Sequence, residues 1–235
     1  MIKAPIYRVS AILSKRYRDF NHHNVANPLW ELIFVLCSTQ TNEANYTRAY
    51  QSLRRRFPSL RQLAAGTCRE FKRLLDPGGL APRKAKEIRG MLDVIIKDFG
   101  RPTLAPLKRM TDHECEQYLT SLSGVGPKVA RCVMMYSLGR AVFPVDIHCW
   151  RVSRRLGWVR KYRPTRNGQI AAMRKLESDI PPHLRHRLHV NLISLGREFC
   201  GLKPRCNECP LTSICPKIGA FHISGKNELA IAIPN

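Results

Sequence analysis

A turn with two glycines, from Leu122 to Lys128 (Leu-Ser-Gly-Val-Gly-Pro-Lys), constrains the fold more than any other segment. The capping box Thr111-Asp-His-Glu114 predicts a helix that runs to the start of this turn. Pro127 is typical of the first turn of a following helix. The segment therefore predicts two helices joined by a tight corner. Backbone N–H groups at such a corner can point at an anion such as a phosphate, although the glycines are equally suited to close packing alone.

The rest of the chain is also patterned for helices. Apolar residues recur at helical spacing, with Lys and Arg between them, and no alternating stretch is long enough for a sheet. The expected helices are 28–40, which is apolar enough to be central and buried, 82–99, which has a basic outer face, 147–156, 168–178 and 184–199. The segment 229–235 is either a short strand or a frayed end. We expect an all-α fold.

The charge of the chain indicates a polyanionic partner. Forty Lys and Arg against 17 Asp and Glu give a formal net charge of +23, an excess that no fold requires and that suits nucleic acid. A generally basic surface or association with ribosomes is the alternative. A membrane is disfavoured, because no stretch approaches the roughly 18 apolar residues of a spanning helix. Residues 1–20 lack the apolar run of a signal peptide, so we expect an intracellular protein, in the cytoplasm or nucleoid.

Four of the nine cysteines are clustered as Cys200-x5-Cys206-x2-Cys209-x5-Cys215. Four thiolates within sixteen residues of an intracellular protein indicate a metal centre, and an all-sulfur set suits zinc or an iron–sulfur cluster. Zinc ribbons use two Cys-x2-Cys pairs, whereas this segment has one pair flanked by single cysteines, which favours a [4Fe-4S] cluster in one loop. The five scattered cysteines are most simply buried small hydrophobic residues.

Lys128 and Asp146 are the candidate catalytic pair. A lysine in the first turn after a corner that binds phosphate lies near the sugar of a bound nucleotide. Its neutral amine can attack C1′, displace the base and leave a Schiff base, while a carboxylate stabilises positive charge on the sugar. The alternative is structural: Lys128 contacts a phosphate, and Asp146 caps the helix that follows it.

Three further residues are candidates for contact with DNA. An enzyme that acts on a base takes the base out of the stack and fills the gap. Gln40, at the end of the buried helix, can fill that gap, and Leu80, at the tip of the loop Asp76-Pro-Gly-Gly-Leu80, can wedge into the opposite strand. His148 either contacts a phosphate or packs inside. The structural alternatives are a polar helix end for Gln40 and a loop anchor for Leu80.

Taken together, these residues resemble the endonuclease III group of the helix-hairpin-helix DNA glycosylases. The resemblance runs from about residue 28 to 216 and rests on Ser38 to Thr41, Gly79-Leu80, Leu122 to Lys128, Val145 to His148 and the four cysteines, in that order. It implies a two-lobed fold: a six-helix barrel lobe at 27–141, and a lobe of 1–26 with 142–235 that holds a [4Fe-4S] cluster at 200–215. It also implies that double-stranded DNA binds between the lobes of a monomer.

The resemblance further implies how the site works. It makes Lys128 the Schiff-base nucleophile and Asp146 the essential carboxylate, and it places Gln40, Leu80, Leu122, Gly124, Val125, Gly126 and His148 against DNA. A bifunctional DNA glycosylase with β-elimination AP lyase activity on a modified or mismatched, pyrimidine-type base is expected. Monofunctional glycosylases for mismatches or 5-methylcytosine, and a non-catalytic DNA-binding module, are the alternatives.

The sequence departs from the family in two places, of which the first implies a tighter cluster loop and the second concerns the substrate. The first cysteine gap has five residues where six are usual, and extra residues fall around 100–111. The longer spacing, together with Ala-Val-Phe-Pro-Val-Asp146 and Arg-Arg-Leu-Gly-Trp-Val159, is similar to the plant 5-methylcytosine glycosylases and to bacterial endonuclease III-like relatives of unsettled substrate. The base that is excised therefore stays open.

Overall fold

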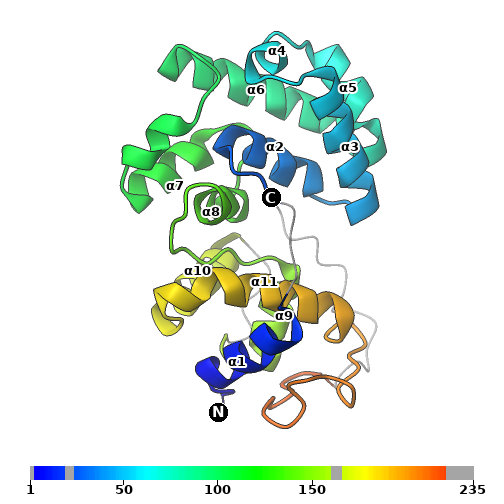
Figure 1. Ribbon diagram of the computed structural model, residues 1–235, viewed down its shortest axis with the longest axis vertical. Coiled ribbons are helices and arrows are strands. Elements are labelled where there is room, and N and C mark those ends of the chain that lie inside the picture. Colours follow the sequence, from blue (N-terminus) through cyan, green and yellow to red (C-terminus); the bar gives the residue numbers. More distant parts are fainter. Residues whose placement is uncertain (1–2, 19–23, 160–165, 221–235) are drawn as a thin grey trace. The chain divides into compact units, whose positions relative to one another are not determined.

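The structure is a computed structural model that describes residues 3–18, 24–159 and 166–220 of the 235-residue chain. In these ranges all regular structure is helical, with eleven α-helices, two 3-10 helices and no strand (Figure 1). The all-α prediction is confirmed. The segment 229–235, expected to be a strand or a frayed end, lies outside the described residues. None of the described helices is long and apolar enough to cross a membrane.

The chain divides into two compact units, which consist of Met1–His22 with Ala141–Asn235, and of His23–Arg140. We call the first the terminal unit and the second the central unit. The central unit contains α2 (Pro28–Ser38), α3 (Glu43–Arg56), α4 (Leu60–Ala64), α5 (Cys68–Leu75), η1 (Asp76–Gly78), α6 (Ala81–Phe99), η2 (Ala105–Arg109), α7 (Asp112–Ser121) and α8 (Pro127–Tyr136). The terminal unit contains α1 (Ile6–Arg16), α9 (Ile147–Arg155), α10 (Arg166–Asp179) and α11 (Pro182–Glu198).

Helix α2 lies at the core of the central unit. The side chain of Asn27 caps it by accepting the N–H groups of Leu29 and Trp30, each at 3.1 Å, and Pro28 occupies its first turn. Every residue from Pro28 to Cys37 is buried. The helix packs against α3, α6 and α8. These neighbours cover the long apolar run, which is central and buried as predicted.

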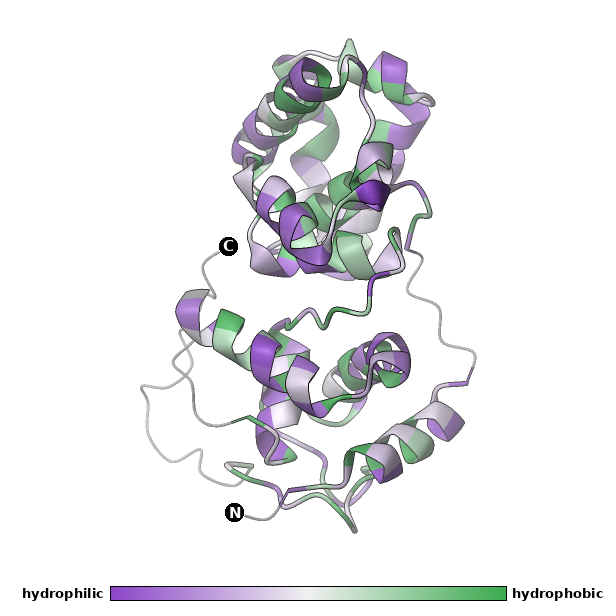
Figure 2. Cartoon of the chain, turned by 90° about the vertical axis from the view of Figure 1, so that its left-hand side faces the viewer, coloured by the Kyte–Doolittle hydropathy of each residue, from purple (hydrophilic) through white to green (hydrophobic). Residues whose placement is uncertain are grey.

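Helix α6 is amphipathic. Its buried residues include Ala81, Ala85, Ile88 and Leu92, which follow the spacing of one helix face. Gly100 ends it at φ +70°, a conformation that glycine adopts without strain. In Figure 2 hydrophilic and hydrophobic residues are interleaved along single helices, which is the pattern of helices that cover a core and face solvent.

The predicted corner between two helices is present as α7 and α8. The capping box of α7 is complete: Thr111 accepts the N–H of Glu114, and the Glu114 carboxylate accepts the N–H of Thr111 at 2.8 Å. A partly buried ion pair joins the two helices, because Arg131 Nε donates to the carboxylate of Glu116 at 2.8 Å. The relative positions of α7 and α8 are thus fixed from within.

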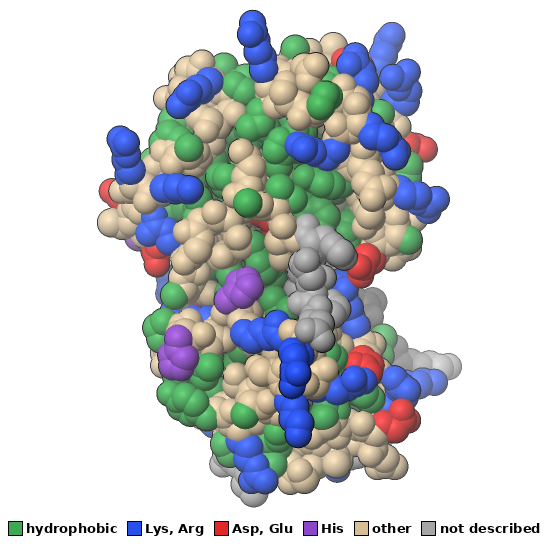
Figure 3. Space-filling model, in the orientation of Figure 1, with side chains coloured by type: hydrophobic (Ala, Val, Ile, Leu, Met, Phe, Trp, Pro, Cys, Tyr) green, Lys and Arg blue, Asp and Glu red, His purple; other side chains and the backbone are tan. Residues whose placement is uncertain are grey.

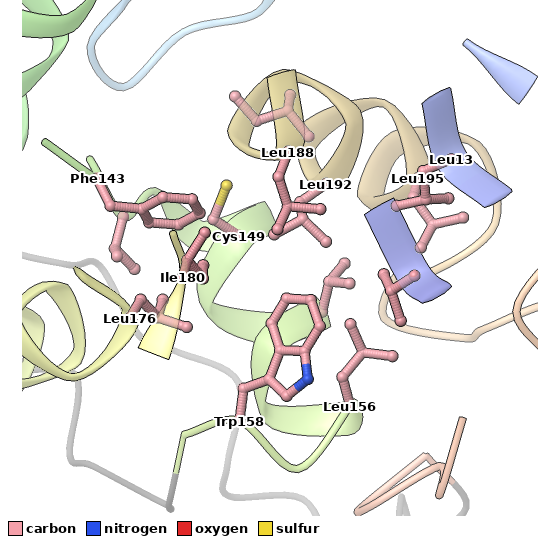
Figure 4. Close-up of a cluster of buried hydrophobic side chains, with 14 of the residues drawn as sticks. Leu13, Phe143, Cys149, Leu156, Trp158, Leu176, Ile180, Leu188, Leu192 and Leu195 are labelled. Carbon is pink, nitrogen blue, oxygen red and sulfur yellow. The ribbon is translucent and has the colours of Figure 1, made fainter. Parts of the chain in front are cut away.

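The terminal unit has its own core. Leu13, Phe143, Cys149, Trp158, Leu176 and Leu192 belong to one buried cluster, in which α1, α9, α10 and α11 all take part (Figure 4). The indole N–H of Trp158 donates to the carbonyl of Ala4 at 2.7 Å, and the N–H of Ala4 donates to the carbonyl of Leu156 at 2.9 Å. The start of the chain is thereby held against α9 and the turn that follows it.

Candidate functional site

The turn between α7 and α8 depends on glycine at position 124. Gly124 has φ +77°, and the N–H of Val125 donates to the carbonyl of Leu122 at 3.2 Å. A Cβ atom at Gly124 would lie 2.6 Å from the carboxyl carbon of Glu87 on α6. Both the left-handed conformation and the closeness of α6 therefore favour glycine here.

The N-terminus of α8 presents backbone donors. Gly126 is its N-cap residue and has no side chain to cap it, and Pro127 occupies the first turn. Among the described residues, the N–H groups of Gly124 and Gly126 have no acceptor. These groups and the helix dipole together make a position that suits an anionic oxygen. Lys128 follows at the second position of the helix, where it is half-buried.

A buried carboxyl group of α2 interacts electrostatically with Lys128. Glu31 has no exposed surface, and its Oε2 accepts the N–H of Val25 at 2.6 Å, whereas Oε1 has no partner among the described residues. Burial raises the pKa of Glu31 to about 7, against the opposing effects of the Val25 N–H and of the Lys128 charge. An acidic group that titrates near neutrality therefore belongs to the surroundings of Lys128.

Asp146 and His148 belong to α9 of the terminal unit. Asp146 is the N-cap of α9, and its Oδ1 accepts the N–H of Cys149 at 2.7 Å. His148 packs on α11, where a Cβ at Gly196 would lie 2.8 Å from His148 Cβ. Its Nδ1 lies 3.0 Å from Arg151 Nη2. Burial lowers the pKa of His148, which Asp146 opposes and Arg151 reinforces, so the ring is neutral near pH 7 and Nδ1 accepts from Arg151.

The four clustered cysteines line one pocket of the terminal unit. Arg155 of α9 is buried and organises this loop, because it donates to the carbonyls of Cys200 and Gly201 at 3.1 and 2.7 Å and to Cys200 Sγ at 3.1 Å. Burial raises the pKa of the Cys209 thiol to about 11, and the other three cysteines raise it further. The four thiols are therefore close enough to influence one another's ionisation. No described group of three His, Cys, Asp or Glu side chains is arranged around a single metal ion.

Gln40 and Leu80 share a rare backbone conformation in the central unit. Their φ angles are +51° and +54°, and among the described non-glycine residues only Lys217 also has a positive φ. A left-handed residue other than glycine costs about 1–2 kcal/mol. Leu80 is 44% exposed although it is a large hydrophobic residue, as the loop sequence predicts, and Gln40 is exposed as well.

Among charged side chains, basic ones outnumber acidic ones. Lys and Arg are spread over the face seen in Figure 3, where Asp and Glu are fewer. This distribution agrees with the net charge of +23 and suits contact with a phosphate backbone.

Comparison with known proteins identifies the family. Residues 33–182 match the model of the HhH-GPD superfamily base excision DNA repair proteins. The chain belongs to this family. A match of this extent includes the corner of α7 and α8, Lys128 and Asp146. The family expected from the resemblance is therefore confirmed.

The relatives place the chain near endonuclease III. It is 31% identical to endonuclease III of Bacillus subtilis, over 81% of both chains. It is 31% identical over 82% of its length to a putative DNA glycosylase of Arabidopsis thaliana, of which it spans 66%. It is 27% identical to the Arabidopsis DNA glycosylase/AP lyase ROS1, of which it spans 13%. An endonuclease III in a non-covalent complex with DNA superposes with a TM-score of 0.76 at 26% identity, covering 90% of this chain and 94% of that one.

Two notable residues escaped sequence reasoning. Glu31 lies within the apolar run Trp30-Glu-Leu32, and Lys84 lies on the face of α6 that also carries Ala81, Ala85 and Ile88. Each is a charged residue at a position where the helical pattern demands an apolar one. That mismatch was a readable signal, because charged residues are almost never fully buried unless they have a partner.

Proposed function

We propose that this chain is a DNA glycosylase with an associated AP lyase activity. The observation that carries the proposal is the placement of Lys128 in the first turn of α8, directly after the uncapped corner Gly124–Gly126. If a phosphate is held at the N–H groups of that corner, the lysine amine reaches the sugar that the phosphate carries. Membership in a base excision repair family supports this chemistry for the residues matched.

The proposed reaction begins at the sugar. The neutral amine of Lys128 forms a bond to C1′ while the bond between C1′ and the base breaks, and the base leaves with its bonding electrons and takes up a proton. The sugar ring opens to a Schiff base between C1′ and Lys128. Loss of a C2′ proton then expels the 3′ phosphate by β-elimination, and water releases the lysine.

Asp146 is proposed to stabilise positive charge that develops on the sugar as the base departs. Its geometry supports this role, because the N–H of Cys149 and the N-terminus of α9 fix a carboxylate at a helix start. Buried Glu31 is proposed as a nearby proton acceptor for the ammonium of Lys128, since one of its oxygens has no partner among the described residues.

Gln40 and Leu80 are proposed to contact the DNA opened around the extruded base, and His148 to contact a phosphate of double-stranded DNA. Gln40 and Leu80 support this proposal because both side chains are exposed. His148 supports it because it lies in the first turn of α9. A pyrimidine-type base is proposed as the substrate. The resemblance of the site motifs to endonuclease III and to the plant 5-methylcytosine glycosylases supports this choice.

The four cysteines are proposed to hold a [4Fe-4S] cluster. Two observations support this: the four thiols line one pocket, and one Cys-x2-Cys pair flanked by single cysteines suits a cluster held by one loop. Bound there, the cluster would tie residues 200–215 to α9 through the Arg155 contacts. Arg155 would donate an N–H to one sulfur ligand.

Product analysis tests the proposal. A panel of duplexes, each with one oxidised pyrimidine, mismatched thymine or uracil, or 5-methylcytosine, is incubated with enzyme under single-turnover conditions. The proposal expects free base together with strands cleaved by β-elimination for at least one duplex. Intact abasic sites would instead indicate a monofunctional glycosylase, and tight salt-dependent binding without base release would indicate a non-catalytic DNA-binding module.

A further inference from the structure

Lys84 on α6 is a charged residue inside the central unit. Its side chain is 2% exposed, and its ammonium group donates to two carbonyl oxygens, that of Cys37 at 2.9 Å and that of Gly78 at 3.1 Å. Burying an ammonium group is unfavourable unless its donors find acceptors. These two contacts are therefore what holds Lys84 in the interior, and they join parts of the chain that are 41 residues apart.

Both carbonyls belong to helix ends. Cys37 is in the last turn of α2, and Gly78 is the last residue of η1. Carbonyl groups at these positions receive no hydrogen bond from an N–H of their own helix, and they lie at the negative end of the helix dipole. One ammonium group thus caps two helices at once, which defines where each helix stops and the following segment begins.

Each capped end leads directly to an exposed non-glycine residue with positive φ, of which the described part of the chain has two. Gln40 follows Cys37 by three residues, and Leu80 follows Gly78 by two. Strained backbone of this kind persists when the surrounding structure over-determines it. Lys84 constrains the backbone before Gln40 and before Leu80, because it holds the carbonyl groups of Cys37 and Gly78 in place.

We propose that Lys84 is a positioning residue that holds Gln40 and Leu80 as one preformed pair for insertion into DNA. The inference rests on the proposed function, in which these two side chains enter the duplex around the extruded base. A preformed pair binds opened DNA without first having to order two separate loops. Lys84 touches neither substrate nor reacting atoms and acts through the two segments.

We call the two hydrogen bonds from Lys84 to the carbonyls of Cys37 and Gly78 the clamp. Hydrogen exchange of the DNA-free protein tests the clamp without any catalytic step. Lys84→Met removes the donors and keeps an apolar stem in the core. We expect amides in both segments, 38–42 and 78–82, to exchange at least about tenfold faster, while the corner of α7 and α8 is unchanged. Lys86→Met is the matched control, because Lys86 is an exposed lysine of the same helix. Acceleration in one segment alone, in neither, or uniformly across the unit would overturn the clamp.

If Lys84→Met does not fold, wild-type protein answers the same question. Exchange is then followed in rising urea below the unfolding transition. The proposal expects the two segments to open together with one urea dependence. Two separate opening reactions would contradict a shared clamp.

A double-mutant cycle tests the role in DNA opening. The duplex contains a stable abasic analogue beside 2-aminopurine, so that fluorescence reports unstacking on binding and no base excision is needed. We expect Lys84→Met to lower the unstacking equilibrium about tenfold in the wild-type background. The same substitution should have almost no effect in a Gln40→Ala/Leu80→Ala protein, because it acts through those residues.

Equal losses in both backgrounds, which a merely structural role would give, would overturn the proposal, as would a wild-type protein that leaves the duplex stacked. Failure of the proposed function is distinguishable, because it appears as unstacking without release of any base from the lesion duplexes.

Discussion

Asp146 Oδ1 accepts the backbone N–H of Cys149 at 2.7 Å and so caps α9. The carboxylate proposed to act on the sugar is thus also a structural residue, and its position is set by the helix that it starts. The two roles are separable, because capping needs an acceptor oxygen whereas stabilising a cation needs a negative charge.

Asp146→Asn should therefore separate catalysis from stability. Asn is as good an N-cap as Asp, so we expect the free energy of unfolding to change by less than about 0.5 kcal/mol, while Asp146→Ala should cost about 1 kcal/mol. The single-turnover rate of base excision should fall at least about 100-fold in both. Urea denaturation and excision assays measure the two quantities. Thr111→Ala, which removes the cap of α7, is the control that should lose stability and keep its rate.

Glu31 should make stability depend on pH. Its pKa in the folded protein is raised from 4.5 to about 7, so the folded state binds the proton more tightly than the unfolded state. The free energy of unfolding should then fall as the pH rises from about 4.5 to about 7, by about 3 kcal/mol, and level off above. Urea denaturation across this pH range should show the fall in wild type and lose it in Glu31→Gln.

Glu70→Gln is the comparison variant, because the pKa of Glu70 is shifted in the opposite direction from that of Glu31. Hydrogen bonds from Thr67 lower the pKa of the Glu70 carboxyl. Its stabilising contribution is present above the unfolded pKa of about 4.5 and is lost as the pH falls. Glu70→Gln should therefore lower the free energy of unfolding above about pH 4.5 and remove pH dependence below it, leaving the slope between pH 4.5 and 7 unchanged. If Glu31→Gln retains the slope between pH 4.5 and 7, the assigned pKa of Glu31 is wrong.

Much of the fold follows from local sequence patterns. The apolar run of α2, the periodicity of α6 and the capping box at Thr111 are visible in the sequence because helix formation depends on neighbours within four residues. The contacts of Lys84 were not predictable, because Cys37 is distant in the sequence. The raised pKa of Glu31 was not predictable either, because it results from burial that only the packed helices create. The left-handed φ of Gln40 was hidden for the same reason: nothing in Ser-Thr-Gln-Thr requires it.

Gly124→Ala should perturb the corner of α7 and α8 in two ways. A residue other than glycine is strained at φ +77°, and the new Cβ would displace the carboxyl group of Glu87, which now pairs with Arg83 at 2.8 Å. We expect a loss of roughly 1–3 kcal/mol in the free energy of unfolding and weaker DNA binding.

Two variants divide that loss into its parts. In Gly124→Ala/Glu87→Ala the displacement is relieved and the conformational cost remains. Gly100→Ala pays a conformational cost alone, since a Cβ there meets nothing within 4 Å. Denaturation and fluorescence anisotropy on a labelled duplex measure both effects. Unchanged DNA affinity in Gly124→Ala would contradict a phosphate contact at the corner.

Removing one clustered cysteine should remove the cofactor. We expect purified wild-type protein to be brown, with about four iron atoms per chain, and Cys206→Ser to lose iron and visible absorbance. Cys68→Ser, on α5 and outside the loop, should keep both. Zinc in place of iron by elemental analysis would overturn the assignment of a [4Fe-4S] cluster.

The most direct measurement of the central claim is borohydride trapping. Enzyme is mixed with a duplex containing an abasic site, the imine is reduced, and the adduct is digested and sequenced by mass spectrometry. The account predicts a covalent adduct on Lys128 that Lys128→Ala abolishes and that Lys97→Ala, which removes an exposed lysine of α6, leaves intact. A wild-type protein that forms no adduct, or forms one at another residue, would contradict it.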